Sequence, residues 1–265
     1  MPRKPPSARK TSPAAETPPG PRGPGERAGL EPGSILRAAH ALARKQGVSA
    51  VSMRRLAKAL GVAPNALYSH FPDKAALLDA LLDHLLSEVT VPSSNPPAGA
   101  AARREHDGLR TSGEGAWATW QEGLADILRQ TRQVLLGHAE LIPLYLARPG
   151  RGPQAARLGE AMLALLAQAG LRDRPAAEAL RVLLIFTLGF AAHEAPRRAD
   201  PTGQERIRES TRAFRQNPEH PHLHSLADEL ARHADHRTFE TGLRWLLASI
   251  AQEAAPAVGN PRLTS

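Results

Sequence analysis

The 265-residue chain contains no cysteine. Disulfide bonds, thiol catalysis and cysteine-ligated zinc are therefore excluded, and such a chain fits a reducing compartment. Long apolar runs are also absent, since the longest, residues 182–192, is far shorter than the roughly 20 residues that cross a bilayer as a helix. No apolar run follows the basic N-terminus, so a secretory signal is not expected. We expect a cytoplasmic protein that does not enter a membrane.

Strand patterns and enzyme motifs are missing as well. No segment shows period-two alternation bounded by turn residues, so the sequence predicts an all-α fold. It has no nucleophile elbow, no phosphate-binding glycine loop and no paired-histidine metal helix. We therefore predict a protein that is not an enzyme and that uses no cofactor and no metal. A helical hydrolase that uses His193 and Glu194 is the weakest alternative.

What the chain does have is positive charge, concentrated at one end. Residues 1–74 hold 13 Lys and Arg against 4 Asp and Glu, whereas the rest of the chain holds 21 against 22. A basic segment on a near-neutral remainder is typical of a phosphate-binding domain joined to a second domain. Residues 1–29 contain eight prolines, four glycines and six basic residues, so we predict that they are disordered. This tail either assists nucleic-acid binding or only aids solubility.

Helical spacing begins near Gly33 and is punctuated by capping residues. A first helix ends before Gly47, Ser52 caps a second that Gly61 ends, Pro64 opens a third, and Asp73 caps a fourth. We expect the third helix to run to about Phe71. The fourth carries an apolar stripe formed by Leu77, Leu78, Leu81, Leu82, Leu85 and Leu86. Later helices are expected at residues 114–137, 140–147, 154–168, 174–194, 225–233 and 237–253, with a short helix possible at 207–214.

Three short helices with a glycine turn between the second and third form a helix-turn-helix pattern. The run "ILRAAHALARKQGVSAVSMRRLAKALGVAPNALYSHFPDKAALLDAL" closely resembles the DNA-binding domain of the tetracycline-repressor (TetR) family. It matches in the glycine after the first helix, in "R-x-L-A-x-x-L-G-V" and in "L-Y-x-H-F-x-x-K". The resemblance implies that the third helix enters the major groove while the second lies across its edge.

The resemblance also implies a role for each matching residue. Arg54 matches a base-contacting arginine that could pair with guanine O6 and N7. Asn65 and Ser69 face the same groove, whereas Ala63, Pro64 and Ala66 offer only apolar contact. Backbone phosphates are expected to meet Ser52, Tyr68, His70 and Lys74. For Tyr68 and His70, a purely structural role is the alternative.

A weaker resemblance to the tetracycline-repressor branch extends through "LIPLYLARP", "ALRVLLIFTLGFAAHEA" and "TFETGLRWLLASI". It implies a core for ligand binding and dimerisation, with a homodimer formed through helices 181–194 and 237–253. The alternative is that these helices form only an internal core. Leu144 stands where that branch has a metal-ligating histidine, which argues against a tetracycline–magnesium effector. We expect the pocket among residues 114–194, with these candidates: His106, Trp117, Trp120, His138, Tyr145 and His193.

Five segments follow from these patterns: a disordered basic tail (1–29), a three-helix helix-turn-helix domain (30–90), a linker or long loop (91–113), a larger helical domain for ligand binding and dimerisation (114–253), and a disordered tail (254–265). The cluster "HPHLH", with His220, His222 and His224, is interpreted as a solvated loop before a helix, not as a metal site.

The leading functional hypothesis is a ligand-responsive repressor. It would bind a pseudo-palindromic DNA operator as a homodimer and be released by a small-molecule effector. The main alternative is an architectural DNA-binding protein with little sequence preference.

Overall fold

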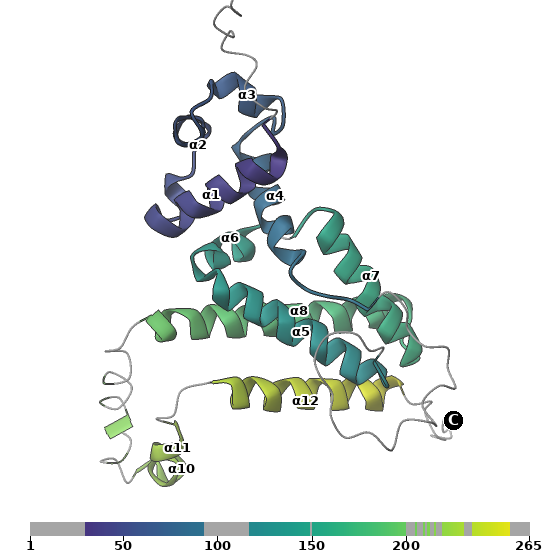
Figure 1. Cartoon of the computed structure of the whole chain (residues 1–265). Coiled ribbons are helices and arrows are strands. Elements are labelled where there is room, and N and C mark those ends of the chain that lie inside the picture. The colour runs from purple at the N-terminus through teal and green to yellow at the C-terminus, as the bar shows by residue number, and fades with distance from the viewer. Residues whose placement is uncertain are drawn as a thin grey trace, which may run out of the picture.

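The computed structural model describes residues 30–92, 117–148, 150–199, 219–230 and 235–254, together with residues 205, 209, 211, 212 and 215. Every regular element in these ranges is helical, which confirms the all-α prediction. Figure 1 shows a small N-terminal group of helices standing on a larger one. We call residues 32–86 the head and residues 120–254 the body.

The head consists of α1 (Pro32–Gln46), the 3-10 turn η1 (Val48–Ala50), α2 (Met53–Leu60), α3 (Pro64–Tyr68) and α4 (Lys74–Leu86). All six leucines of the predicted α4 stripe are buried. They share a core with apolar side chains from the other helices, among them Ile35, Ala39, Leu56 and Leu67, which are fully buried. The head therefore folds around α4, which then continues down into the body (Figure 1).

The predicted caps of the head are confirmed. Ser52 Oγ accepts a hydrogen bond from the backbone N–H of Arg55 at 3.3 Å, and Asp73 Oδ1 accepts from Ala76 N–H at 2.7 Å. Helix α3 is shorter than predicted, because it ends at Tyr68 and not near Phe71. Pro72 disfavours the helical conformation at Phe71, and the Phe71 side chain packs into the core outside the helix.

The body begins with α5 (Trp120–Gly137), followed by η3 (Ala139–Leu141), α6 (Ile142–Ala147), α7 (Pro153–Gln168) and α8 (Asp173–Ala199). It ends with α10 (Pro221–Ser225), α11 (Ala227–Leu230) and α12 (His236–Ala254). Helix α5 starts at Trp120, later than predicted, because the Thr119 hydroxyl caps it by accepting from Glu122 N–H at 3.2 Å. In Figure 1, α8 and α12 run side by side along the base of the molecule.

The three helices α5, α8 and α12 meet around a buried guanidinium group. Arg132 on α5 is fully buried, and its Nε and Nη2 donate to Glu194 Oε2 on α8 at 2.9 and 2.5 Å. The guanidinium carbon also lies 4.8 Å from the ring centre of Phe239 and 5.7 Å from that of Phe190. Cation–π contact and the ion pair together satisfy a charge that would otherwise be costly to bury.

Helix α8 is relevant to the expectation that no segment of the chain is long enough to cross a membrane. Its segment Asp173–Pro196 is long and apolar enough to cross a membrane by length and composition, because the helix continues past the apolar run at both ends. Only 22% of its most apolar window is buried within one chain. One side of α8 packs on α5, α6 and α7, which leaves an apolar side open beside α12.

The helix predicted at residues 225–233 is confirmed at Ala227–Leu230, and residues 231–233 lie outside the described residues. The structure has two short helices there, and the cluster "HPHLH" contributes to the first of them instead of forming a loop. Pro221 suits the first turn of α10, where its missing N–H costs nothing. Residues 1–29, the short helix at 207–214 for the most part, and most of the proposed linker and C-terminal tail lie outside the described residues.

Candidate nucleic-acid interface and its link to the body

The turn between α2 and α3 fixes the angle at which α3 is presented. Gly61 has φ 65° and ψ 31°, a left-handed conformation that ends α2. Val62 N–H then donates back to the Ala57 carbonyl at 3.0 Å. Pro64 occupies the first turn of α3, and Leu67 anchors the helix in the core with no exposed surface. These contacts leave the opposite side of α3 facing solvent.

The exposed side of α3 carries the polar side chains that the sequence singled out. Asn65, Tyr68, Ser69 and His70 are all exposed, with Tyr68 at 49%. The Ser69 hydroxyl donates to the Ala66 carbonyl at 2.8 Å, so its oxygen is free only to accept a further hydrogen bond. Within the described residues, Asn65 and Tyr68 form no side-chain hydrogen bond that would occupy them. This surface has polar groups available and little bulk.

Two cations flank that surface. Arg54, in the first turn of α2, and Lys74, the first residue of α4, are both exposed and make no ion pair within the described part of the chain. The neighbouring Arg55 instead donates through Nη1 to Gln46 Oε1 at 3.2 Å. Ser52 is half-buried and already accepts a backbone hydrogen bond as a cap, so its hydroxyl can offer only its proton to a phosphate.

Helix α4 connects this surface to the body through polar contacts along its length. In the middle of this helix, Asp79 accepts hydrogen bonds from Arg148 Nε at 2.7 Å and Nη2 at 2.9 Å. This two-pronged bond holds the pKa of the Asp79 carboxyl below its usual value, with a smaller contribution from the positive charge of Arg148. Arg148 follows α6 directly, so the pair ties α4 to that end of the body.

A second contact lies in the last turn of α4. The buried Asp83 carboxylate accepts from the backbone N–H groups of Gln154 and Ala155, at 3.0 and 2.9 Å, and so caps α7. Gly152 approaches closely, with φ 143°, and a Cβ there would collide with the Asp83 carboxyl group. The cap therefore depends on glycine at this position.

Further contacts extend to the end of α4 and beyond it. The Tyr145 hydroxyl of α6 donates to the Leu82 carbonyl at 2.5 Å, and burial raises the pKa of that phenol. Arg157 of α7 donates through Nη2 to the Val89 carbonyl at 2.7 Å. Gln130 of α5 accepts from Thr90 N–H at 2.8 Å. These contacts tie α4 and the residues that follow it to α5, α6 and α7.

The predicted pocket residues that the structure describes lie in different parts of the body. The Trp117 indole donates to Asp126 at 3.1 Å and packs beside Gly123, near Trp120, which begins α5. Tyr145 is buried at the contact with α4, His193 is exposed on α8, and His106 lies outside the described residues. Only His138 among them borders a hollow of about 360 Å³, whose other lining residues are Glu88, Arg129, Gln130, Gln133, Val134 and Gly137.

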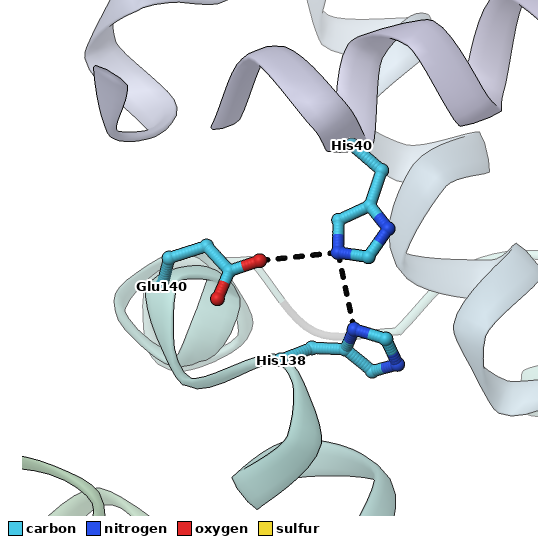
Figure 2. A group of neighbouring side chains, drawn as sticks. All are labelled: His40, His138 and Glu140. Atoms are coloured by element: carbon cyan, nitrogen blue, oxygen red, sulfur yellow. Dashed lines mark hydrogen bonds and ion pairs between the residues drawn. The ribbon is translucent and has the colours of Figure 1, made fainter. Parts of the chain in front are cut away.

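One group of neighbouring side chains was not predicted from the sequence. His40 of α1, His138 at the end of α5 and Glu140 of η3 converge where the head meets the body (Figure 2). His40 is 98 residues from His138 and 100 from Glu140, so no local pattern could indicate that they meet. The exposed histidines of α10 are not part of any such converging group among the described residues.

The chain matches two family models. Residues 35–81 match the model described as "Bacterial regulatory proteins, tetR family". Residues 113–254 match "Tetracyclin repressor-like, C-terminal domain". The two matches fall on the head and the body respectively.

Relatives and solved structures agree with those matches. The tetracycline repressor protein class A from transposon 1721 of Escherichia coli is 30% identical over 224 residues, covering 84% of this chain and 91% of the relative. The HTH-type transcriptional repressor DrrR1 of Streptomyces coeruleorubidus is 31% identical over 176 residues, covering 64% and 58%. The structure of ActR from Streptomyces coelicolor in complex with actinorhodin aligns with a TM-score of 0.70 and 26% identity, covering 86% of this chain and 100% of ActR.

Proposed function

The chain belongs to the tetracycline-repressor (TetR) family of bacterial transcriptional regulators, and from this premise we propose that it is a repressor that binds a pseudo-palindromic operator as a homodimer and is released by a small-molecule effector. The observation that carries the proposal is the head itself. A glycine-hinged α3 presents free polar side chains to solvent, and α4 joins that surface to three helices of the body. DNA binding and effector binding would thus be linked by one helix.

Operator readout is proposed to concentrate in a few side chains. Arg54 would pair with a guanine edge, with Asn65 and Ser69 reading adjacent bases in the major groove. Tyr68, His70, Lys74 and the Ser52 hydroxyl would meet phosphates and position the head without selecting a sequence. The small residues Pro64 and Ala66 allow α3 to lie close to the base edges.

The open side of α8 supports the homodimer. Val182 and Ile185 are 48% and 63% exposed, and Trp245 on the adjacent α12 is 67% exposed. Apolar side chains of this size, aligned on two neighbouring helices, are typical of a surface covered by a partner. A second copy would cover them as a four-helix bundle with twofold symmetry and place two heads on one face of the DNA.

Sedimentation or light scattering at micromolar concentration tests the dimer. Ile185→Asp and Trp245→Asp are expected to yield monomers. Leu146→Asp, at an apolar α6 position that is 58% exposed but lies outside this face, serves as the control and should remain dimeric. A wild-type chain that runs as a monomer would contradict this part of the proposal.

Effector release is proposed to act through α4. The helices α5, α6 and α7 that hold α4 belong to the region expected to enclose the effector. A molecule that favours a different placement of these helices would shift the population towards head spacings that do not fit both half-sites. The related ActR was solved with actinorhodin, which supports an organic effector here. Leu144 is buried and apolar, so a tetracycline–magnesium effector is not proposed.

Selection of bound DNA from a random pool, at moderate salt, tests the function. The repressor proposal predicts enrichment of an inverted repeat, and repetition with candidate small molecules should identify those that release it. Removal of residues 1–29 should preserve the sequence preference while making binding less dependent on salt. Binding without any preference would favour the architectural alternative.

A further inference from the structure

The contact between head and body holds three side chains with metal-ligand chemistry. His40 Nε2 lies 3.1 Å from Glu140 Oε1 and 3.0 Å from His138 Nδ1, and the three ligand atoms all lie within 4.8 Å of one another. Figure 2 shows the Glu140 carboxylate and His138 Nδ1 both turned towards His40 Nε2. The side chains of His40, Glu140 and His138 are 22%, 21% and 18% exposed, so the group is sheltered without being sealed.

These side chains have too few hydrogens for each of their close polar contacts to be a hydrogen bond. His138 Nε2 lies 3.2 Å from Glu88 Oε1, and a carboxylate can only accept, so this nitrogen carries the proton and leaves Nδ1 of a neutral His138 as a lone pair. His40 Nε2 likewise needs its proton for Glu140. That single hydrogen therefore faces two acceptors, the Glu140 oxygen and His138 Nδ1. Moving the proton to His138 Nδ1 would instead set the His40 lone pair against the Glu140 carboxylate.

A cation removes the conflict. In place of the shared hydrogen, it would accept a lone pair from each of the three atoms at once. A metal ion roughly 2.0 to 2.1 Å from imidazole and carboxylate ligands holds tetrahedral neighbours about 3.3 Å apart. The two separations from His40 Nε2, 3.1 and 3.0 Å, are close to this value, and the third pair of ligand atoms lies within 4.8 Å. Two imidazoles and one carboxylate suit a transition-metal dication of the zinc class, whereas Mg²⁺ and Ca²⁺ prefer oxygen ligands alone.

The surroundings complete such a site. Glu88 accepts from the far nitrogen of His138, the arrangement that commonly fixes the tautomer and orientation of a metal-bound histidine. His138 and Glu88 also line the hollow of about 360 Å³ beside α5, whereas His40 and Glu140 do not. From these observations we propose that His40, His138 and Glu140 bind a zinc-class metal ion that joins the head to the body.

A metal ion at this position would connect the head to the body. His40 belongs to α1 of the head, whereas His138 and Glu140 belong to the segment between α5 and α6 of the body. An ion held by both restrains the head in the placement seen here, in parallel with α4. This consequence for DNA binding rests on the proposed function, but metal binding itself does not.

Zinc titration of the tag-free, full-length chain, after treatment with a chelator, tests the site. Competition with a chromophoric chelator should give one Zn²⁺ per chain, and Co²⁺ should give the visible absorption of a four-coordinate ion. His40→Gln and Glu140→Gln should each weaken binding at least about 100-fold, and Glu88→Gln by about 10-fold, because outer partners typically contribute about 10- to 100-fold. The matched control is the triple variant His220→Asn, His222→Asn, His224→Asn, which should bind as the wild type does.

Amide hydrogen exchange provides the second measurement. Zn²⁺ should slow exchange in α1 around His40 in the wild type but not in His138→Gln, provided that far-UV circular dichroism shows both folded. Unchanged Zn²⁺ affinity in the His40 variant, loss of binding in the triple variant, or no saturable wild-type binding would each overturn the proposal. Zn²⁺ should also alter the affinity for a selected operator in the wild type but not in His138→Gln. If no operator preference exists, the repressor function fails while the titration still decides the site.

Discussion

The head and the body use their polar side chains in opposite ways. On the head, Asn65, Tyr68 and Arg54 are exposed and have no side-chain partner among the described residues. In the body, Arg132 and Glu194 are buried and are paired across helices α5 and α8. The helices of the head are placed by caps and glycine, which leaves its outer side chains free to meet DNA. The body instead uses ionic groups to set how its helices pack.

This difference predicts two kinds of mutational effect, one on DNA binding and one on stability. A substitution on the outer face of the head should change DNA binding while leaving stability almost untouched. A substitution at a buried ionic group of the body should reduce stability first, and should affect DNA binding only through unfolding or through displacement of α4.

Arg132→Ala should produce the largest loss. It leaves the Glu194 carboxylate without its main buried partner and removes the cation held between Phe190 and Phe239. Breaking a buried pair in this way typically costs about 3 to 5 kcal/mol. Urea unfolding followed by circular dichroism measures the change.

Arg129→Ala is the matched control for Arg132→Ala, because Arg129 forms a similar two-pronged bond with Glu240 in which its side chain is 46% exposed. Its loss should cost about 1 kcal/mol or less, as for exposed pairs generally. Equal losses for the two variants would show that burial does not distinguish the pairs. The folded fraction of either variant should keep the wild-type sequence preference.

Arg54→Ala should produce the clearest effect in the head. If Arg54 reads a guanine, the substitution should erode discrimination between operator variants by about 1 to 3 kcal/mol. Lys74→Ala, the matching change at a proposed phosphate contact, should weaken binding to all sequences alike. It should also reduce the slope of log affinity against log salt concentration by about 1. Fluorescence anisotropy across a panel of operator variants measures both. Indistinguishable profiles would contradict the assigned roles, and a large loss of stability in either would contradict the separation of regions.

The same contrast explains what the sequence could predict. Ser52, Gly61 and Asp73 act within four residues of their own positions, so the helices of the head and its exposed face were predictable from local pattern and family resemblance. Arg132 and Glu194 are 62 residues apart, and His40 and Glu140 are 100 apart, so these pairs depend on tertiary packing that no spacing rule indicates. The described pocket candidates, such as Tyr145 and His193, likewise lie far apart in sequence, and no spacing rule indicates which of them share a site.

Tyr68→Phe tests whether the exposed phenol meets phosphate. The ring is retained, so stability should not change, because the hydroxyl forms no hydrogen bond within the described residues. If the hydroxyl donates to a phosphate, all DNA sequences should lose about 0.5 to 1.5 kcal/mol of binding free energy. Wild-type affinity in the variant would assign Tyr68 a packing role only. Thermal unfolding is the accompanying control.

Asp79→Asn should give the smallest effect, and it falls on the helix that joins the two regions. Arg148 holds the pKa of the Asp79 carboxyl below its unfolded value of about 3.9, so the pair stabilises the fold fully above that pH. Its contribution is lost as pH falls through the lower folded pKa, because the protonated carboxyl no longer attracts the guanidinium group.

The difference in unfolding free energy between wild type and Asp79→Asn should therefore be constant from pH 7 to about 5 and shrink as the pH approaches 3. Urea titrations at several pH values measure it, with Arg148→Gln as the partner variant that should show the same pH dependence. A difference that persists at the lowest pH would mean that Asp79 acts by packing and not by charge. Because α4 carries the head, a small stability change accompanied by a clear change in operator release would place this pair in the coupling between body and DNA.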